Sequence, residues 1–283
     1  MSVLKVLMLG DICGASGRAM FQKHAARLKH QYGAAALIVN GENSAATGKG
    51  ITSRIVQFFK QHGANVVTTG NHIWAQREIY SYLKDHTDLL RPANFPSGCP
   101  GVGVTTFDVE GVTVGVINVQ ARTFMRELVS CPFKTTESLL TYLKSRTSVI
   151  LIDFHGEATS EKMGLAYFVD GKVSAVVGTH THVLTNDARV LPGGTAYVTD
   201  LGMAGALNSM IGMKKESVIQ QLITQMPARF DVETEGPMIL TGVCIAIDTE
   251  TGKALSIEPV KVIDEEIVVD SVDEFDERRR PSF

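Results

Sequence analysis

Short apolar runs alternate, in the first part of the chain, with stretches whose apolar residues recur at helical spacing. The apolar runs predict buried strands at Val3–Leu9, Ala35–Val39 and Val66–Thr69. The helical spacing predicts helices at Arg18–His30, Ile51–Gln61 and Ile79–Lys84. A regular alternation of strand and helix is typical of α/β proteins, so we expect that fold class.

The pattern changes in the middle of the chain. Glu110-Gly111 separates two strand-like segments and predicts a hairpin of Val104–Val109 and Val112–Asn118. A helix is expected at Thr135–Lys144, and further strands at Val149–Phe154, Lys172–Val177, Ala196–Val198, Ile239–Ile247 and Ala254–Val262. Hairpin-like strands after a strand–helix alternation favour mixed pairing, so we expect two packed mixed β-sheets flanked by helices.

Length and composition set the expected domain organisation. The chain has 283 residues, of which 44% are hydrophobic, enough for one large domain with a well-buried core. We find no internal repeat and no convincing linker, and therefore predict a single domain over residues 1–283. Its last part, residues 266–283, is acidic and then basic, and is expected to be a loosely ordered tail.

Charge and cysteine usage narrow the class of protein. The formal net charge is -3, from 27 basic and 30 acidic residues, which is not the footprint of a duplex nucleic-acid binder. The four cysteines form no Cys-x-x-Cys pair, so we expect free thiols in a reducing compartment. Neither a signal peptide nor an apolar run of about 20 residues is evident, so we expect a cytoplasmic protein without membrane contact. We also expect a homo-oligomer, although no sequence stripe demonstrates one.

Polar side chains of metal-binding type follow five of the predicted strands. Ligands of α/β sheets bind at the carboxyl ends of strands, where these residues would gather. Oxygen and nitrogen donors of this kind suit manganese, iron or zinc, whereas a structural zinc site would need thiolates, of which only Cys13 is near. The candidates are Asp11, Glu42, Asn43, Asn71, His72, His155, His180 and His182.

Each of these residues has an ordinary structural explanation when it is taken alone. Asp11 and Glu42 stand in common turn sequences, and His155 alone is better explained as a satisfied buried histidine. The strongest single signal is Gly178-Thr179-His180-Thr181-His182, because alternate residues of an extended segment point to one side. Together the residues make a stronger case, because four of the eight histidines stand at strand ends. The other four fall on or beside helices: His24, His30, His62 and His86.

The ordered motifs also carry a family resemblance. Gly10-Asp11, Gly41-Glu42-Asn43, Gly70-Asn71-His72, His155 and Gly178-Thr179-His180-Thr181-His182 resemble the blocks of the calcineurin-like metallophosphoesterases. Two features resemble more closely the YmdB-like bacterial cyclic-nucleotide phosphodiesterases. One is the stretch from Asp153 to Lys162, and the other is Cys at 13 and Glu at 42, where the superfamily usually has His and Asp. The resemblance runs from residue 3 to about residue 262.

This resemblance implies a fold, a cofactor and roles for the candidate residues. It implies the calcineurin-like metallophosphoesterase fold and two metal ions, iron first, with manganese or zinc as alternatives. One ion would be bound by Asp11, Glu42, Asn43 and His182, and the other by Glu42, Asn71, His155 and His180. His72 would be the catalytic histidine. The implied reaction is hydrolysis of 2',3'- or 3',5'-cyclic nucleotides by a metal-bridging hydroxide; Cys13 is better explained as a packed thiol than as a ligand.

Three other functions are alternatives for this sequence. A P-loop requires Gly-x-x-x-x-Gly-Lys-[Ser/Thr], but Asn43 stands five residues before Gly48, and Gly50 follows Lys49. A non-catalytic scaffold for RNA or protein, stabilised by metal, is disfavoured by the spare histidine. A phosphomonoesterase cannot be separated from a phosphodiesterase by sequence chemistry alone.

Residues that would contact the substrate are less evident. Thr47-Gly48-Lys49-Gly50 and Ser16-Gly17-Arg18 stand near helix starts and could cradle phosphate, although helix capping beside a solvated cation explains both more simply. Arg122 and the stretch Met203–Asn208 are candidates for shaping the pocket. We therefore assign no substrate-binding residue from the sequence.

Overall fold

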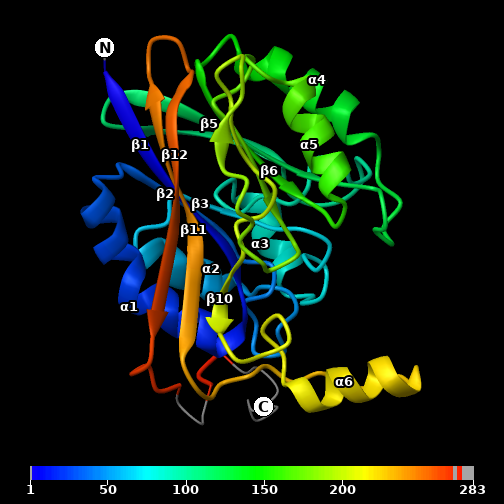
Figure 1. Ribbon diagram of the computed structural model, residues 1–283. Coiled ribbons are helices and arrows are strands. Elements are labelled where there is room, and N and C mark those ends of the chain that lie inside the picture. Colours follow the sequence, from blue (N-terminus) through cyan, green and yellow to red (C-terminus); the bar gives the residue numbers. More distant parts are fainter. Residues whose placement is uncertain (1, 270–272, 276–283) are drawn as a thin grey trace.

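The computed structural model of the protein describes residues 2–269 and 273–275, and this part of the chain contains two six-stranded β-sheets (Figure 1). The first sheet has the order β12-β11-β10-β1-β2-β3 and the second β4-β5-β6-β7-β9-β8. The strands of the first are β1 (Val3–Ile12), β2 (Ala36–Asn40), β3 (Val66–Thr68), β10 (Met203–Ala206), β11 (Met238–Asp248) and β12 (Ala254–Asp264). Those of the second are β4 (Val104–Val109), β5 (Val112–Gln120), β6 (Val149–His155), β7 (Ala175–Thr179), β8 (Arg189–Val190) and β9 (Ala196–Val198).

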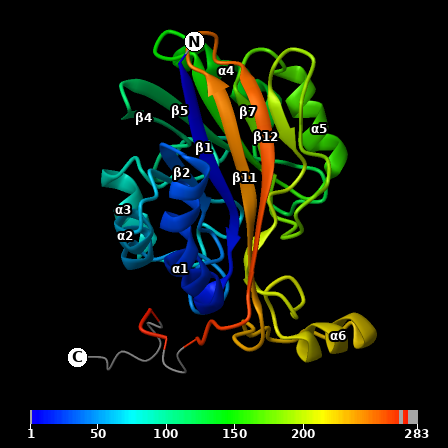
Figure 2. The ribbon, with the colours of Figure 1, turned by 60° about the vertical axis from the view of Figure 1, so that its left-hand side comes forward.

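Helices cover the outer face of each sheet, and one further helix, α6, projects from the body. The helices are α1 (Gly14–Tyr32), α2 (Ser53–Gln61), α3 (Ile79–Asp85), α4 (Pro132–Leu143), α5 (Thr159–Phe168) and α6 (Lys215–Thr224). Figure 2 shows α1, α2 and α3 on one side of β1, β11 and β12, and α5 on the other. Both sheets mix parallel and antiparallel pairs, so the expected α/β class with two packed mixed sheets is confirmed.

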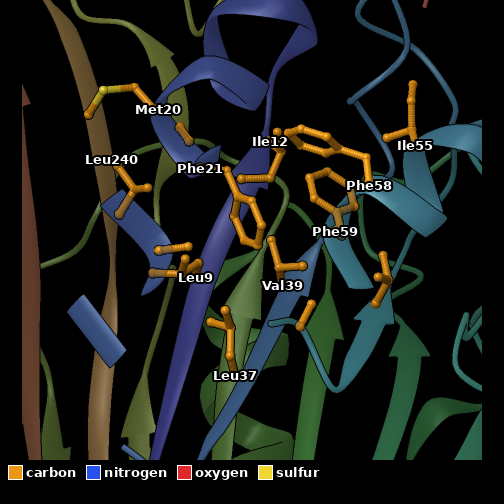
Figure 3. Close-up of a cluster of buried hydrophobic side chains, with 14 of the residues drawn as sticks. Leu9, Ile12, Met20, Phe21, Leu37, Val39, Ile55, Phe58, Phe59 and Leu240 are labelled. Atoms are coloured by element: carbon orange, nitrogen blue, oxygen red, sulfur yellow. The ribbon is translucent and has the colours of Figure 1, made fainter. Parts of the chain in front are cut away.

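The position of strand β1 between two packed layers explains why its sequence is almost entirely apolar. Leu7 and Leu9 pack with α1 and α2, whereas Val6 and Met8 pack in the layer between the two sheets. Both faces of the strand are therefore buried, and alternation of apolar and polar residues is lost. Figure 3 shows the helix side of this core, where the rings of Phe21 and Phe59 meet edge to face with centroids 4.9 Å apart.

Several element boundaries differ from those that the sequence predicts. Strand β1 continues past Leu9 to Ile12, because Asp11 gains partners on both sides, in β10 and β2. Strand β7 begins at Ala175 rather than Lys172, because Gly171, with φ of 75°, and Lys172 form a turn. Helix α1 begins at Gly14 rather than Arg18. The elements absent from the prediction are β8, β10, α5 and α6.

Two segments lie at the lower end of the molecule in Figure 1. Helix α6 projects from the body, and none of its residues is buried. The segment Asp273–Phe275 contacts α1 and α2, where Asp273 pairs with Arg18 and the Phe275 ring lies 5.6 Å from that of Phe58. The remainder of the predicted tail, residues 270–272 and 276–283, lies outside the described residues. Within the described chain, no helix combines the length and apolar character that crossing a membrane requires.

Candidate metal centre

The candidate residues come from both sheets and meet where the carboxyl ends of their strands converge. Asp11 lies on β1, Glu42 follows β2 and Asn71 follows β3, all in the first sheet. His155 ends β6, and His180 and His182 follow β7 in the second sheet. The structure also brings Asn43 and His72 to this cluster, so all eight candidates lie together.

The imidazole of His155 is the centre of one group of donor atoms. Its Nε2 lies 3.1 Å from Glu42 Oε1, 3.0 Å from Asn71 Oδ1 and 3.1 Å from His180 Nδ1. Oxygen and imidazole nitrogen atoms that face one another at this spacing need a proton or a cation between them. The donor set of Glu42, His155 and His180 therefore has the chemistry and the spacing of a metal site.

Hydrogen bonds behind His155 set its tautomer. The Thr179 hydroxyl donates to Asp153 at 2.7 Å, so its oxygen accepts from His155 Nδ1 at 2.9 Å. That leaves the Nε2 lone pair of His155 pointing at the donor group. Burial raises the pKa of Asp153 to about 6, so its carboxyl is largely ionised at neutral pH and can accept the hydroxyl proton.

A carboxylate likewise sets the tautomer of His180. Its Nε2 lies 3.2 Å from the Glu157 carboxylate, which accepts the N–H and leaves Nδ1 free. Burial and then the nearby His155 lower the pKa of His180 to about 3. The ring is therefore neutral at physiological pH, the form in which histidine binds metal.

A second group of donors surrounds His182. The Nδ1 of His182 donates to the carbonyl of Ile211 at 2.8 Å, so Nε2 is left facing Asp11 Oδ1 at 3.6 Å. The amide nitrogen of Asn43 lies 3.1 Å from His182 Nε2 and 3.4 Å from Asp11 Oδ1. The Asn43 oxygen instead accepts from His72 Nδ1 at 2.8 Å. If Asn43 is to bind metal through its oxygen, as the family resemblance implies, its amide must turn over.

Cys13 lies near Nδ1 of His182, not near the Nε2 that faces the donor group. Its Sγ lies 3.5 Å from His182 Nδ1 and 3.7 Å from the Asp11 backbone carbonyl, whereas it is His182 Nε2 that faces the Asp11 carboxylate. The side chain is fully buried and next to the start of α1. This position fits the packed thiol that we expected.

Buried carboxylates give the cluster its charge. Burial raises the pKa of Glu42, but His155 outweighs it and holds that pKa well below the usual value. Burial likewise raises the pKa of Asp11, and His182 reverses the effect. Burial lowers the pKa of His155, whereas the Glu42 carboxylate raises it above the ordinary value. In the absence of metal a proton thus takes the place of a cation, and metal binding should release it.

The loop that carries His180 and His182 has a strained backbone, and a buried carboxylate holds it by a hydrogen bond. Both residues have a positive φ, 103° for His180 and 64° for His182, a backbone conformation that costs free energy for any residue other than glycine. The backbone N–H of Thr181, between them, donates to Asp200 at 3.0 Å. Asp200 in turn pairs at 2.7 Å with Lys162, and both side chains are completely buried. This buried ion pair holds the histidine loop in place.

Replacing Lys162 by methionine should destabilise the protein by about 3–5 kcal/mol, because it leaves the Asp200 carboxylate buried without its cation. Chemical denaturation monitored by circular dichroism measures the loss. The double variant Lys162→Met with Asp200→Asn removes the uncompensated charge and should recover part of the stability. Equal stability of the single variant and the wild type would contradict this role.

A cavity of about 340 Å³ opens over the cluster. Glu42, Asn43, His72, His180 and His182 line one part of it. The other lining residues include Gly48, Lys49, Glu157, Ile211, Met213 and Phe230. Of the two predicted phosphate-binding segments, the one around Lys49 is therefore at the site.

Of the other segments considered, Met203 and Leu207 line an adjoining cavity together with His182, whereas the two arginines do not line the cavity over the cluster. Arg18 is buried within α1, where it donates to the Ser44 carbonyl and pairs with Asp273. The backbone N–H of Arg122 donates to Glu161. Glu157, Ile211, Met213 and Phe230 were not predicted. Only Glu157 could have been predicted from the sequence, because it stands two residues after His155 in the stretch that carries the family resemblance.

Comparison with known proteins shows what this chain is similar to. The family model described as YmdB-like protein matches residues 7–260. A Bacillus subtilis protein named 2',3'-cyclic-nucleotide 2'-phosphodiesterase is 46% identical over 262 residues, which are 93% of this chain and 98% of the relative.

Two solved structures are also similar. A Mycoplasma pneumoniae protein described as a novel phosphatase is 33% identical and superposes with a TM-score of 0.87 over 94% of this chain and 95% of that one. A Thermus thermophilus protein described as hypothetical is 35% identical, with a TM-score of 0.84 over 92% of this chain and 100% of that one. The resemblance inferred from the motifs is therefore confirmed, and so is the metallophosphoesterase fold.

Proposed function

The chain belongs to the YmdB-like protein family, and on that premise we propose that it is a two-metal phosphodiesterase that hydrolyses cyclic nucleotides. The 2',3'-cyclic nucleotides are the first choice because of the Bacillus subtilis relative, and 3',5'-cyclic nucleotides are the second. The observation that carries the proposal is the group of donor atoms around His155 Nε2, with its tautomer set by Thr179. That arrangement suits a metal cation.

The proposed metal shells follow the two groups of donors. Asp11, Glu42, Asn43 and His182 would hold one ion, and Glu42, Asn71, His155 and His180 the other. When bound, the pair of ions supplies an activated water and positive charge next to the phosphate. Asp11 and Glu42 neutralise only part of that charge, and Asn71 contributes an oxygen without a further negative charge. The remaining positive charge attracts the phosphodiester anion.

His72 is proposed to act on the leaving group. Its side chain lines the cavity, and its Nδ1 faces the cluster, 2.8 Å from Asn43 Oδ1 and 3.4 Å from Glu42 Oε1, so Nε2 is the nitrogen left for the substrate. In hydrolysis of a 2',3'-cyclic phosphate a P–O bond to water forms, the P–O2' bond breaks, and O2' must take up a proton. His72 in its doubly protonated imidazolium form would deliver that proton from Nε2 as a general acid.

A substrate panel tests the proposed activity. The metal-loaded protein should hydrolyse 2',3'-cyclic AMP with a higher kcat/KM than 3'-AMP. The second candidate is a phosphomonoesterase, which the Mycoplasma pneumoniae phosphatase favours. A preference for 3'-AMP would replace the first proposal by the second. No turnover of either by a fully metallated sample would favour a non-catalytic scaffold.

Imidazole and carboxylate donors accept iron, manganese and zinc. Iron is the proposed metal because the family resemblance puts it first, and manganese and zinc are the alternatives. Metal analysis of the purified protein decides among them. We further propose that the protein acts in the cytoplasm as a homo-oligomer on small molecules. Analytical ultracentrifugation measures the oligomeric state.

Replacing Thr179 by valine should weaken metal binding by about 10- to 100-fold. Valine keeps the buried shape of threonine but removes the hydroxyl that accepts from His155 Nδ1. Competition with a chelator measures the metal affinity. Thr141→Val, on the exposed face of α4, is the matched control and should leave the affinity unchanged. An affinity unaltered in Thr179→Val would show that this hydroxyl does not orient His155.

A further inference from the structure

The cavity over the metal centre has an apolar part that phosphate chemistry does not require. Ile211, Met213 and Phe230 line this part. Phosphate and metal ions would occupy only the charged part. The volume of about 340 Å³ falls within the range of roughly 300–1,000 Å³ that is usual for organic ligands.

Ile211 occupies an unusual backbone position. The backbones of Met210 and Met213 exchange hydrogen bonds of 2.8 and 3.0 Å, which closes a two-residue hairpin turn. Its two central residues, Ile211 and Gly212, have φ of 50° and 100°. Hairpin turns with two positive φ values strongly favour Asn-Gly, and a β-branched residue at such a position is strained.

Neither packing nor hydrogen bonding explains the isoleucine. The carbonyl of Ile211 accepts from His182 Nδ1, but any residue at this position would offer the same carbonyl. The residue is 52% exposed, so its side chain is not held there by the core. It also lines an adjoining cavity of about 320 Å³, so it stands between two hollows of the surface. Strained residues that persist without structural benefit concentrate at ligand sites.

We propose that the side chains of Ile211 and Phe230 form the wall against which the nucleobase of the substrate packs. This inference rests on the proposed function and names the part of the substrate that the enzyme recognises besides the phosphate. A nucleobase is flat and has apolar faces, which an aromatic ring and a branched aliphatic side chain can cover. Stacking on one aromatic side chain commonly changes binding by about tenfold or more.

The test compares a cyclic phosphate that carries a nucleoside with one that does not. 2',3'-Cyclic AMP carries adenine on its ribose, whereas glycerol 1,2-cyclic phosphate has the same five-membered phosphate ring with neither ribose nor base, so the wall variants assign the difference to the base. Ile211→Asn keeps the backbone carbonyl and relieves the strain, because asparagine accepts positive φ. It should raise Tm by about 2–4 °C, and it should raise KM for 2',3'-cyclic AMP about tenfold relative to KM for glycerol 1,2-cyclic phosphate. Phe230→Leu should change the same ratio without the rise in Tm.

Ile219→Asn, on exposed α6, is the matched control and should leave the ratio unchanged. If Ile211→Asn impaired both substrates equally, the residue would act through His182 and the base wall would be wrong. A wild type with equal KM for both substrates would also overturn the base wall, while leaving the phosphodiesterase proposal intact. Absence of turnover of both substrates would instead reject the proposed function.

A binding measurement tests the wall independently of turnover. The metal-loaded wild type should bind 3'-AMP at least about ten times as tightly as inorganic phosphate, and both wall variants should lose that difference. Equal affinities of the wild type for 3'-AMP and phosphate would reject the wall whether or not the protein is a phosphodiesterase.

Discussion

Replacing Glu42 by glutamine is expected to remove both metal ions and to lower phosphodiester hydrolysis by about a thousandfold. Glu42 Oε1 lies 3.1 Å from His155 Nε2 and 3.3 Å from the Asn43 amide nitrogen, so this one carboxylate reaches both donor groups. Glutamine has nearly the same shape but no negative charge. Metal ions contribute several kcal/mol to such reactions, and about 4 kcal/mol corresponds to a thousandfold change in rate.

Metal analysis and steady-state kinetics of Glu42→Gln together measure this effect. Glu137→Gln, on the exposed surface of α4, is the matched control and should retain metal and activity. Circular dichroism of the variant should show the fold of the wild type. A Glu42→Gln protein with two metal ions per chain and full activity would reject the proposed bridging role.

Replacing His72 by alanine should leave the metal content largely intact and lower kcat by about 10²- to 10⁴-fold, the usual contribution of a general acid. The His72 side chain lines the cavity and is 30% exposed, whereas the side chains of the proposed histidine ligands are 0% (His155), 7% (His182) and 23% (His180) exposed. His30→Ala, at the exposed end of α1, is the matched control. If metal were lost in proportion to activity, His72 would be a ligand rather than the proton donor.

The sequence predicted the candidate residues better than the cavity around them. Asp11, His155 and His180 were found because each follows an apolar run, and polar atoms at the end of a buried strand must be satisfied by some partner. Ile211 and Phe230 stand in an irregular segment without periodicity. Their positions depend on contacts with loops far away in the sequence, such as the hydrogen bond from His182 to the Ile211 carbonyl.

The same distinction applies to the fold. Strands β4 and β9 have the predicted bounds, because turn residues delimit short apolar segments. Strand β10 was missed because its four small or flexible residues, Met203–Ala206, lack a strand pattern. It exists because β1 and β11 offer it backbone partners on both sides. Pairing between distant segments is a property of the assembled sheet, and local sequence does not contain it.

The buried pair of Lys162 and Asp200 has a consequence for evolution. A lone change at either position leaves one charge without its partner in the interior, and the histidine loop depends on Asp200 through Thr181. Selection should therefore remove single substitutions and tolerate only exchanges at both positions. Across species, the two positions should covary even though 38 residues separate them along the chain.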